Sequence, residues 1–153
     1  MNNIELCIKE LGYAVVPTKG TSMLPLLEEG KSLVEVEAST LKQLKEGDVV
    51  LYKKNDGTLV LHRIIKVECE GIFAVLGDHQ FKNAERVNKN QIIAVACGFF
   101  IKGRYVTEKT RWYRLYKKIW LCNLNFRRII LLTFRLQSQS FLYSLYHRIF
   151  SLT

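Results

Sequence analysis

Gly20-Thr21-Ser22-Met23-Leu24-Pro25 is the stretch around which this chain is organised. Pro25 fixes its own φ angle and biases the preceding residue towards an extended conformation, whereas Gly20 accepts backbone angles that other residues resist. The sequence therefore predicts a rigid, exposed bend that presents the hydroxyl group of Ser22. Taken alone, such a stretch is typical of a turn with two solvated hydroxyls, so its meaning depends on the segments that follow.

Those segments up to residue 104 read as a small antiparallel β domain. A short N-terminal helix ends at Gly12, and apolar runs separated by turn signals follow it. Asn55-Asp56-Gly57, between two of these runs, predicts a β-hairpin. Gly98 interrupts the last run and indicates a bulge or a close approach of two backbones. The expected strands are 13–16, 33–37, 49–52, 59–67, 72–76 and 91–101, with a polar loop from Gly77 to about residue 89.

Charge divides the 153-residue chain, which carries a net charge of +9, into two parts. Residues 1–104 hold 14 Lys and Arg against 13 Asp and Glu, whereas residues 105–153 hold nine against Glu108 alone. We therefore predict a β domain over 1–104 and a cationic tail over 105–153. The predicted fold class is mainly β, with antiparallel coiled sheets and a C-terminal basic α-helical extension.

The tail has a helical period with apolar residues on one face and basic residues between them. Trp112, Leu115, Tyr116, Ile119 and Trp120 recur at helical spacing, and the pattern repeats over 126–134 and 141–150. One interpretation is that the helices fold back and bury their aromatic face on the β domain. The other is peripheral contact with an anionic membrane, with Trp112 and Trp120 at the interface. We expect no nucleic-acid partner, because no recognised binding module accompanies the charge.

The sequence also limits the compartment and the cofactors. Residues 1–16 lack the basic start and apolar run of a signal peptide, and no stretch approaches the ~20 apolar residues of a spanning helix. We therefore expect a cytoplasmic or peripheral membrane protein. The cysteines, expected to be small buried hydrophobes, form no CxxC pair and no Cys/His cluster with metal-ligand spacing. Neither a metal site nor a cofactor is expected. The cysteines are Cys7, Cys69, Cys97 and Cys122.

Serine, histidine and acidic residues occur beside turns or on strands that turns could bring together. The hydroxyl of Ser22 needs a nearby base to become nucleophilic, and His62 is the side chain best suited to that task near neutral pH. A carboxylate such as that of Asp78 could then hold the imidazole tautomer. This combination is consistent with a serine hydrolase, although these residue types are common.

The order of four short motifs resembles the type I signal peptidase family, whose β fold is shared by LexA-type self-cleaving repressors. The motifs are Gly20-Thr21-Ser22-Met23-Leu24-Pro25, Gly47-Asp48-Val49-Val50, Leu61-His62-Arg63-Ile64 and Gly77-Asp78. The histidine in the third motif resembles the archaeal, endoplasmic-reticulum and sporulation-type branch. The common bacterial branch and the repressors have a catalytic lysine there, which disfavours a self-cleaving regulator.

The resemblance implies a serine endopeptidase that cleaves leader or signal-like peptides, in precursor proteins, after small residues. Ser22 would be the nucleophile and His62 the general base. The backbone N–H of Ser22 would donate to the oxyanion, with Thr21 beside it, and Met23 would help to shape a substrate pocket. The peptide would lie extended along a strand edge.

The chain departs from the family pattern at its acidic loop, at Gly20 and at the N-terminus. The family loop continues from Gly-Asp to a second Asp that is absent here, so either Asp78 or Glu85 orients His62, or neither does. Some relatives place a serine where Gly20 stands, and the usual N-terminal anchor is missing. The missing second Asp keeps an alternative open, namely a catalytically impaired protein of this fold that binds peptides or membranes.

Overall fold

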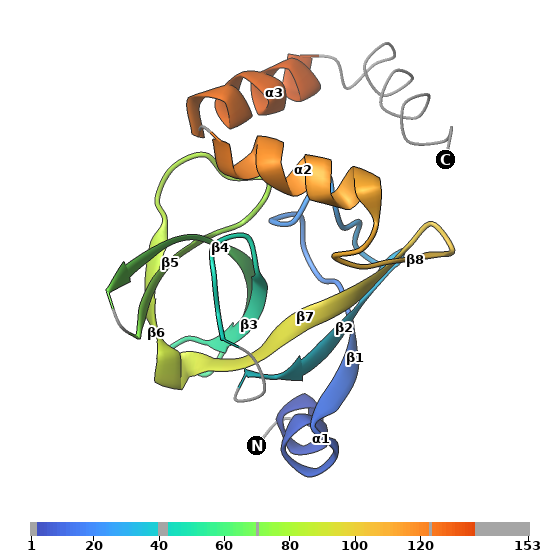
Figure 1. Cartoon of the computed structure of the whole chain (residues 1–153), viewed down its shortest axis with the longest axis vertical. Helices are drawn as coiled ribbons and strands as arrows, with labels where there is room; N and C mark the ends of the chain where they lie inside the picture. The colour runs from blue at the N-terminus through green and yellow to red at the C-terminus, as the bar shows by residue number, and fades with distance from the viewer. Residues whose placement is uncertain (1–2, 40–42, 70, 123, 137–153) are drawn as a thin grey trace.

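The computed structural model describes residues 3–39, 43–69, 71–122 and 124–136. Two clusters of strands curl around a core, with α2 and α3 at one end of the molecule and α1 at the other (Figure 1). The elements are α1 (Asn3–Leu11), β1 (Tyr13–Pro17), β2 (Ser32–Ala38), β3 (Val49–Lys53), β4 (Leu59–Cys69), β5 (Ile72–Leu76), β6 (Glu85–Asn88), the 3-10 turn η2 (Lys89–Gln91), β7 (Ile92–Ile101), β8 (Arg104–Val106), α2 (Arg111–Cys122) and α3 (Leu124–Leu136).

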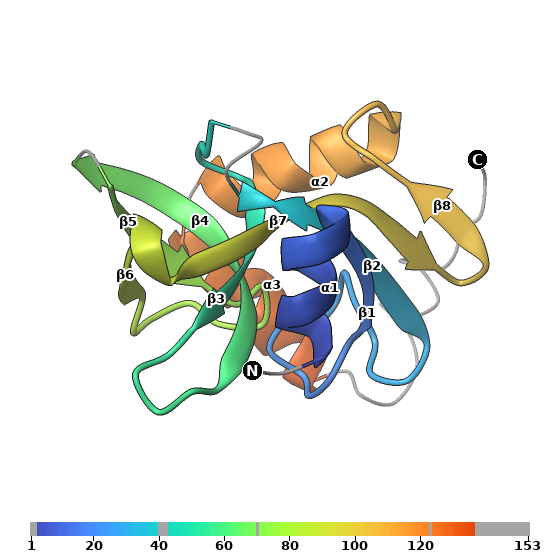
Figure 2. The ribbon, with the colours of Figure 1, turned by 90° about the horizontal axis from the view of Figure 1, so that it is seen from below.

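The strands form one antiparallel sheet in the order β1-β2-β7-β3-β4-β5-β6, and β8 pairs with β7 off this path. The long strand β7 joins the two halves, because it pairs with β2 and also with β3. In both views α1 lies against β1 and β2 (Figure 2). The predicted mainly antiparallel β fold with a helical C-terminal part is therefore confirmed.

Local signals account for the turns that set this register. Gly12 ends α1 with a φ of 80°, and its N–H donates to the Ile8 carbonyl. In the hairpin at Asn55-Asp56-Gly57, the Lys54 N–H donates to Thr58 O over 2.9 Å. Gly57 there has a φ of 87°, which a side chain would oppose. The turn starts the β3–β4 ladder at Lys53 opposite Leu59, as predicted.

Three expectations need correction. The segment expected to be a polar loop contains β6, whose residues pair with β5. A further short strand, β8, follows β7 and packs the Tyr105 ring against Gly98, where no side chain would fit. The cysteines are not buried hydrophobes, because Cys7, Cys69 and Cys122 are exposed. All of the helical pattern over 141–150 lies outside the described residues.

The first hydrophobic core lies between the sheet and the helices. Residues of β1, β2 and β7 pack there with the bend after β1 and with the inner face of α2, namely Tyr113, Tyr116 and Trp120. Trp120 is only 4% exposed, so its predicted position at a membrane interface is wrong. For α2 the fold-back interpretation holds. The division of the chain at residue 104 stays a prediction.

A second core fills the curl of β3, β4, β5, β6 and β7. It contains Val50, Tyr52, Ile64, Phe73, Val75, Val87, Ile92 and Val95. Adjacent residues of β3 therefore serve different cores, since Leu51 belongs to the first core and its neighbours belong to the second. Among the described residues, no helix has both the length and the apolar character needed to cross a bilayer.

A buried ion pair links β4 to the segment after β5 and, through it, to α2. Arg63 on β4 donates from Nε and Nη2 to the two carboxylate oxygens of Asp78, over 2.8 and 2.6 Å, and both side chains are fully buried. The Tyr116 hydroxyl donates to Asp78 over 2.9 Å, and the Trp120 Nε1–H donates to the Asp78 carbonyl. Asp78 thereby fastens α2 to the sheet.

We expect Asp78→Asn to lower the free energy of unfolding by about 3–5 kcal/mol, because it leaves the buried Arg63 charge without a counter-ion. The measurement is urea denaturation at neutral pH. The matched control is Glu68→Gln, which removes an exposed partner of Arg86 and is expected to cost about 1 kcal/mol or less. Equal effects of the two substitutions would contradict the prediction.

Candidate functional site

Ser22 lies on the bend that the sequence predicts, directly after β1. Gly20 has a φ of 75°, and the Leu24–Pro25 peptide bond is cis. The Leu24 N–H donates to Thr21 O and the Leu27 N–H donates to Met23 O, so the bend is closed by its own backbone. Met23 is buried, Thr21 is exposed and Ser22 is half-buried. The bend is thus anchored on its apolar side and leaves its hydroxyls towards the surface.

Gly77, at the end of β5, is where the bend meets the sheet. The His79 N–H donates to the Ser22 carbonyl over 2.8 Å. A Cβ atom on Gly77 would stand 2.5 Å from the Ser22 carbonyl oxygen and 3.1 Å from the Ser22 Cβ. Such distances are well inside van der Waals contact, so only glycine lets the Ser22 backbone approach here.

His62 reaches the same place from β4. In the antiparallel β4–β5 ladder Arg63 pairs with Leu76. Continuing this register by one residue puts His62 opposite Gly77. On its other side His62 pairs with Val50 of β3. The imidazole is 4% exposed. The fold therefore brings the bend of Ser22 and the strand position of His62 to either side of one glycine.

The His62 ring contacts a tyrosine that the sequence analysis did not single out. Its Nδ1 lies 3.2 Å from the Tyr52 hydroxyl, and that hydroxyl donates to Glu85 Oε2 over 2.9 Å. Lys54 holds the other carboxylate oxygen of Glu85 over 2.7 Å. The hairpin register could have identified Tyr52. Val50 pairs with His62, and Tyr52 lies two residues further along β3, so its side chain is on the same face of the sheet as His62.

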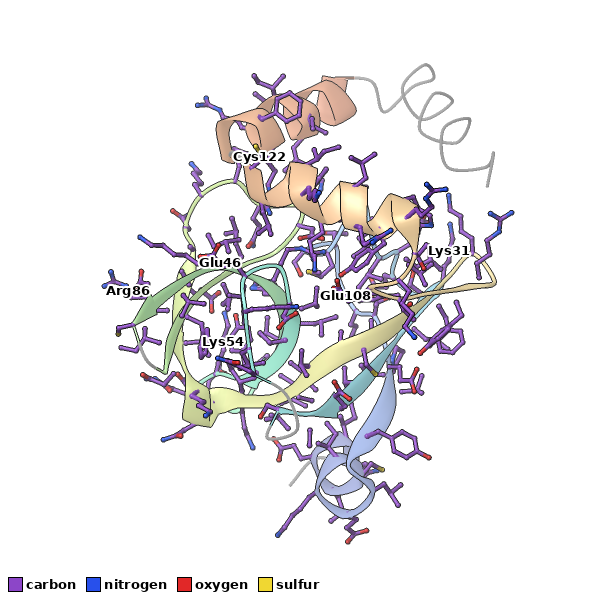
Figure 3. All side chains as sticks on the ribbon, viewed as in Figure 1. Lys31, Glu46, Lys54, Arg86, Glu108 and Cys122 are labelled. Carbon is purple, nitrogen blue, oxygen red and sulfur yellow. The ribbon has the colours of Figure 1, made fainter. Side chains whose placement is uncertain are left out.

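The electrostatic surroundings keep His62 neutral near pH 7. Burial lowers the pKa of the imidazole below its usual value. The charge of Glu85 opposes this shift, Lys54 reinforces it, and Asp78 opposes it more weakly than Glu85. Burial acts to raise the pKa of Glu85, but its hydrogen bonds to Lys54 and Tyr52 and the charge of Lys54 outweigh this and lower it, so Glu85 is a carboxylate. Lys54 is labelled in Figure 3 together with Arg86, the neighbour of Glu85 at the outer edge of the sheet.

Asp78 and Glu85, the two candidates for orienting His62, have different partners. The Asp78 carboxylate is held by Arg63 and Tyr116, and it acts on His62 through its charge. Glu85 is joined to the ring through Tyr52. The orienting role of Asp78 stays a prediction. Among the described residues, no group of three or more Cys, His, Asp or Glu side chains could hold a metal ion.

A groove of about 510 Å³ opens beside Ser22. Its walls are mostly apolar and come from α1, the end of β1, the bend, β3 and the start of β4; they include Ile4, Val16, Pro17, Ser22, Met23, Leu27, Leu51, Leu59 and Leu61. In the described residues β1 is an edge strand, and the β4–β5 ladder begins only at Arg63. Two strand edges therefore border the groove.

Comparison with known proteins gives a partial match. No family model matches the chain. A segment of 71 residues, 44% of the chain, is 30% identical to Signal peptidase I W of Bacillus subtilis (strain 168), and the match spans 37% of that relative's length. This partial match of low identity suggests a relationship to signal peptidases.

We expect Gly77→Ala to destabilise the fold by about 1–3 kcal/mol, because the added methyl group collides with the Ser22 backbone. The measurement is thermal unfolding followed by circular dichroism. The control is Gly20→Asn in the same bend, where a Cβ would meet nothing within 4 Å and where Asn tolerates a positive φ. An unchanged melting temperature for Gly77→Ala would rule out the close approach.

Proposed function

We propose that this protein is a serine endopeptidase of the signal peptidase type, in which Ser22 is the nucleophile and His62 the general base. It would cleave leader or signal-like peptides after small residues. The observation that carries the proposal is the approach of the Ser22 bend and the His62 position to Gly77, beside an apolar groove. The partial likeness to Signal peptidase I W supports it.

In this proposal the reaction is acyl transfer in two steps. Ser22 Oγ attacks the scissile carbonyl carbon while the His62 imidazole takes the hydroxyl proton. The Ser22 N–H, with Thr21 beside it, donates to the oxyanion. His62 then gives its proton to the leaving amine as the C–N bond breaks, and a water molecule hydrolyses the acyl-enzyme by the reverse proton path. The lowered pKa of His62 favours this role because it keeps the ring unprotonated at neutral pH.

The groove is suited to an extended peptide. Main-chain groups at the edges of β1 and β4 would hydrogen-bond the peptide backbone, as in strand addition to a sheet. Alternate side chains of the peptide would then point into the apolar wall, which Met23 and Leu61 help to form. In this proposal, selectivity resides in the residues preceding the cleaved bond.

The alternative proposal is a catalytically impaired protein that binds peptides in the same groove. It is motivated by Asp78, whose carboxylate is engaged by Arg63 and Tyr116. Labelling by a fluorophosphonate separates the two proposals, because only an activated serine forms the covalent adduct. An adduct that maps to Ser22 favours the peptidase.

We expect Ser22→Ala and His62→Ala each to reduce the cleavage of an Ala-x-Ala peptide by about 10⁴-fold or more, because the two residues act as a unit. Cleavage is measured by mass spectrometry of the products. Ser39→Ala is the matched control, since its hydroxyl bonds the Ile92 carbonyl away from the groove. Unchanged cleavage by both site variants would refute the proposed function.

We further propose that α2 and α3 contact an anionic membrane surface peripherally. Their outer faces expose apolar residues at 39–60% of their area, namely Leu115, Phe126, Ile129 and Leu132. Exposed basic residues stand among them, namely Arg111, Arg114, Lys118 and Arg128. Apolar side chains beside cationic ones are typical of helices that lie in a bilayer interface. These residues replace the buried Trp120 as the expected anchors.

We expect the protein to bind vesicles that contain phosphatidylserine. Its binding should be weaker to pure phosphatidylcholine vesicles, and weaker to either kind of vesicle in high salt. Leu115→Ser should weaken binding about five- to tenfold, because burying the exposed half of this side chain in the interface contributes about 1–1.5 kcal/mol, roughly half the value for full burial. Leu11→Ser on α1 is the matched control, since Leu11 is 63% exposed and Leu115 is 60% exposed. Co-sedimentation measures both, and equal weakening by the two variants would contradict this surface.

A further inference from the structure

We propose that Tyr52 is a positioning residue of the active site, whose hydroxyl links the Glu85 carboxylate to the His62 ring. We call this hydrogen-bonded chain of Glu85, Tyr52 and His62 the relay. The inference rests on the proposed function and deepens it. In serine hydrolases a carboxylate commonly touches the histidine directly. Here a phenol stands between them, with 3.2 Å from the His62 Nδ1 to the Tyr52 hydroxyl and 2.9 Å from that hydroxyl to Glu85.

The direction of each hydrogen bond follows from the donors available. An ionised carboxylate only accepts, so the single hydroxyl hydrogen of Tyr52 points to Glu85. The Tyr52 oxygen is then an acceptor on its other side, and the His62 Nδ1 must supply the hydrogen. In the neutral ring the lone pair consequently lies on Nε2. That nitrogen is the one left to accept a proton from Ser22.

Burial shields the hydrogen bonds between Glu85, Tyr52 and His62 from water. Tyr52 is 1% exposed and His62 is 4% exposed, and their rings are 5.9 Å apart between centroids. Water therefore has little access to the Nδ1 side of the imidazole, and the hydroxyl is its polar neighbour there. Because a buried polar group without a partner is costly, the hydroxyl holds both the orientation and the tautomer of the ring.

The charges around the ring divide into two roles. Glu85 is held by Lys54 at the rim of the sheet, and through Tyr52 it faces the imidazolium that forms during proton transfer. Asp78 is bound to Arg63 and Tyr116, so its charge is largely balanced within its own cluster. Among the described residues, Tyr52 contacts the His62 ring, and Glu85, Lys54 and Asp78 act on its pKa through their charges. The relay accordingly assigns the orienting function to Glu85 rather than Asp78.

The first test needs no substrate. Nitrogen chemical shifts of the labelled His62 ring, recorded at a pH where the ring is neutral, report which nitrogen carries the hydrogen. We expect Nδ1–H in the wild type and a shift of the population towards Nε2–H in Tyr52→Phe. A wild-type ring protonated on Nε2 would overturn the relay, whatever the cleavage assay shows.

The second test uses the pH profile of peptide cleavage. Tyr52→Phe should lower kcat by about 10–100-fold with little change in KM, the loss that is usual for partners behind a reacting group. Glu85→Gln should move the acidic limb to lower pH, because the carboxylate raises the pKa of His62 and the unprotonated ring is the active form. Tyr105→Phe is the matched control, since its hydroxyl also donates to a glutamate, Glu35, on the other half of the sheet.

A double-mutant cycle decides whether Glu85 acts through Tyr52. If it does, Glu85→Gln lowers kcat in the wild type but adds little further loss in the Tyr52→Phe protein. Fully additive losses, or Tyr52→Phe activity equal to that of Tyr105→Phe, would overturn the relay. Cleavage that survives Ser22→Ala and His62→Ala would instead overturn the proposed function, so the two failures are distinguishable.

Discussion

The buried ion pair between Arg63 and Asp78 is the contact on which the rest of the molecule depends. Two charges at full burial are tolerable because each has further hydrogen bonds: Arg63 also donates to the Gly47 carbonyl, and Asp78 also accepts from the Tyr116 hydroxyl. Asp78 follows Gly77 directly, so the pair also fixes where β5 ends and where the Ser22 backbone rests. The same carboxylate draws α2 onto the sheet through Tyr116. One interaction thus places the helical layer and the bend together.

The pleat of β4 separates structural from chemical roles. His62 and Arg63 are neighbours in sequence, yet successive residues of a strand face opposite sides. Arg63 turns to Asp78 beneath α2, whereas His62 turns to Tyr52 and, beyond it, Glu85. The stabilising charges therefore stand apart from the ring that is proposed to move a proton. A substitution at either position would act through a different cluster.

The hairpin, the end of the first helix and most strands could be predicted from short-range signals alone. Asn55-Asp56-Gly57 selects its turn by backbone angles, and alternating apolar residues identify strands without any knowledge of their partners. The strand β6 could not be predicted, because Glu85–Asn88 is polar except for Val87 and owes its conformation to pairing with β5. The sequence likewise left open whether Trp120 is buried on the β domain or lies at a membrane interface, and its hydrogen bond to the Asp78 carbonyl decides for burial.

For the candidate site, the sequence by itself determined the residue types that could carry the chemistry, namely a serine on a proline-closed bend, a histidine on a strand and two acidic residues downstream. Only the tertiary structure decided their partners. Asp78 forms an ion pair with Arg63, and Glu85 is linked to His62 through Tyr52, because contacts between distant segments depend on strand register and burial. The chemistry that a side chain can perform is fixed by its residue type, whereas its distance to other functional side chains is fixed only when the sheet folds.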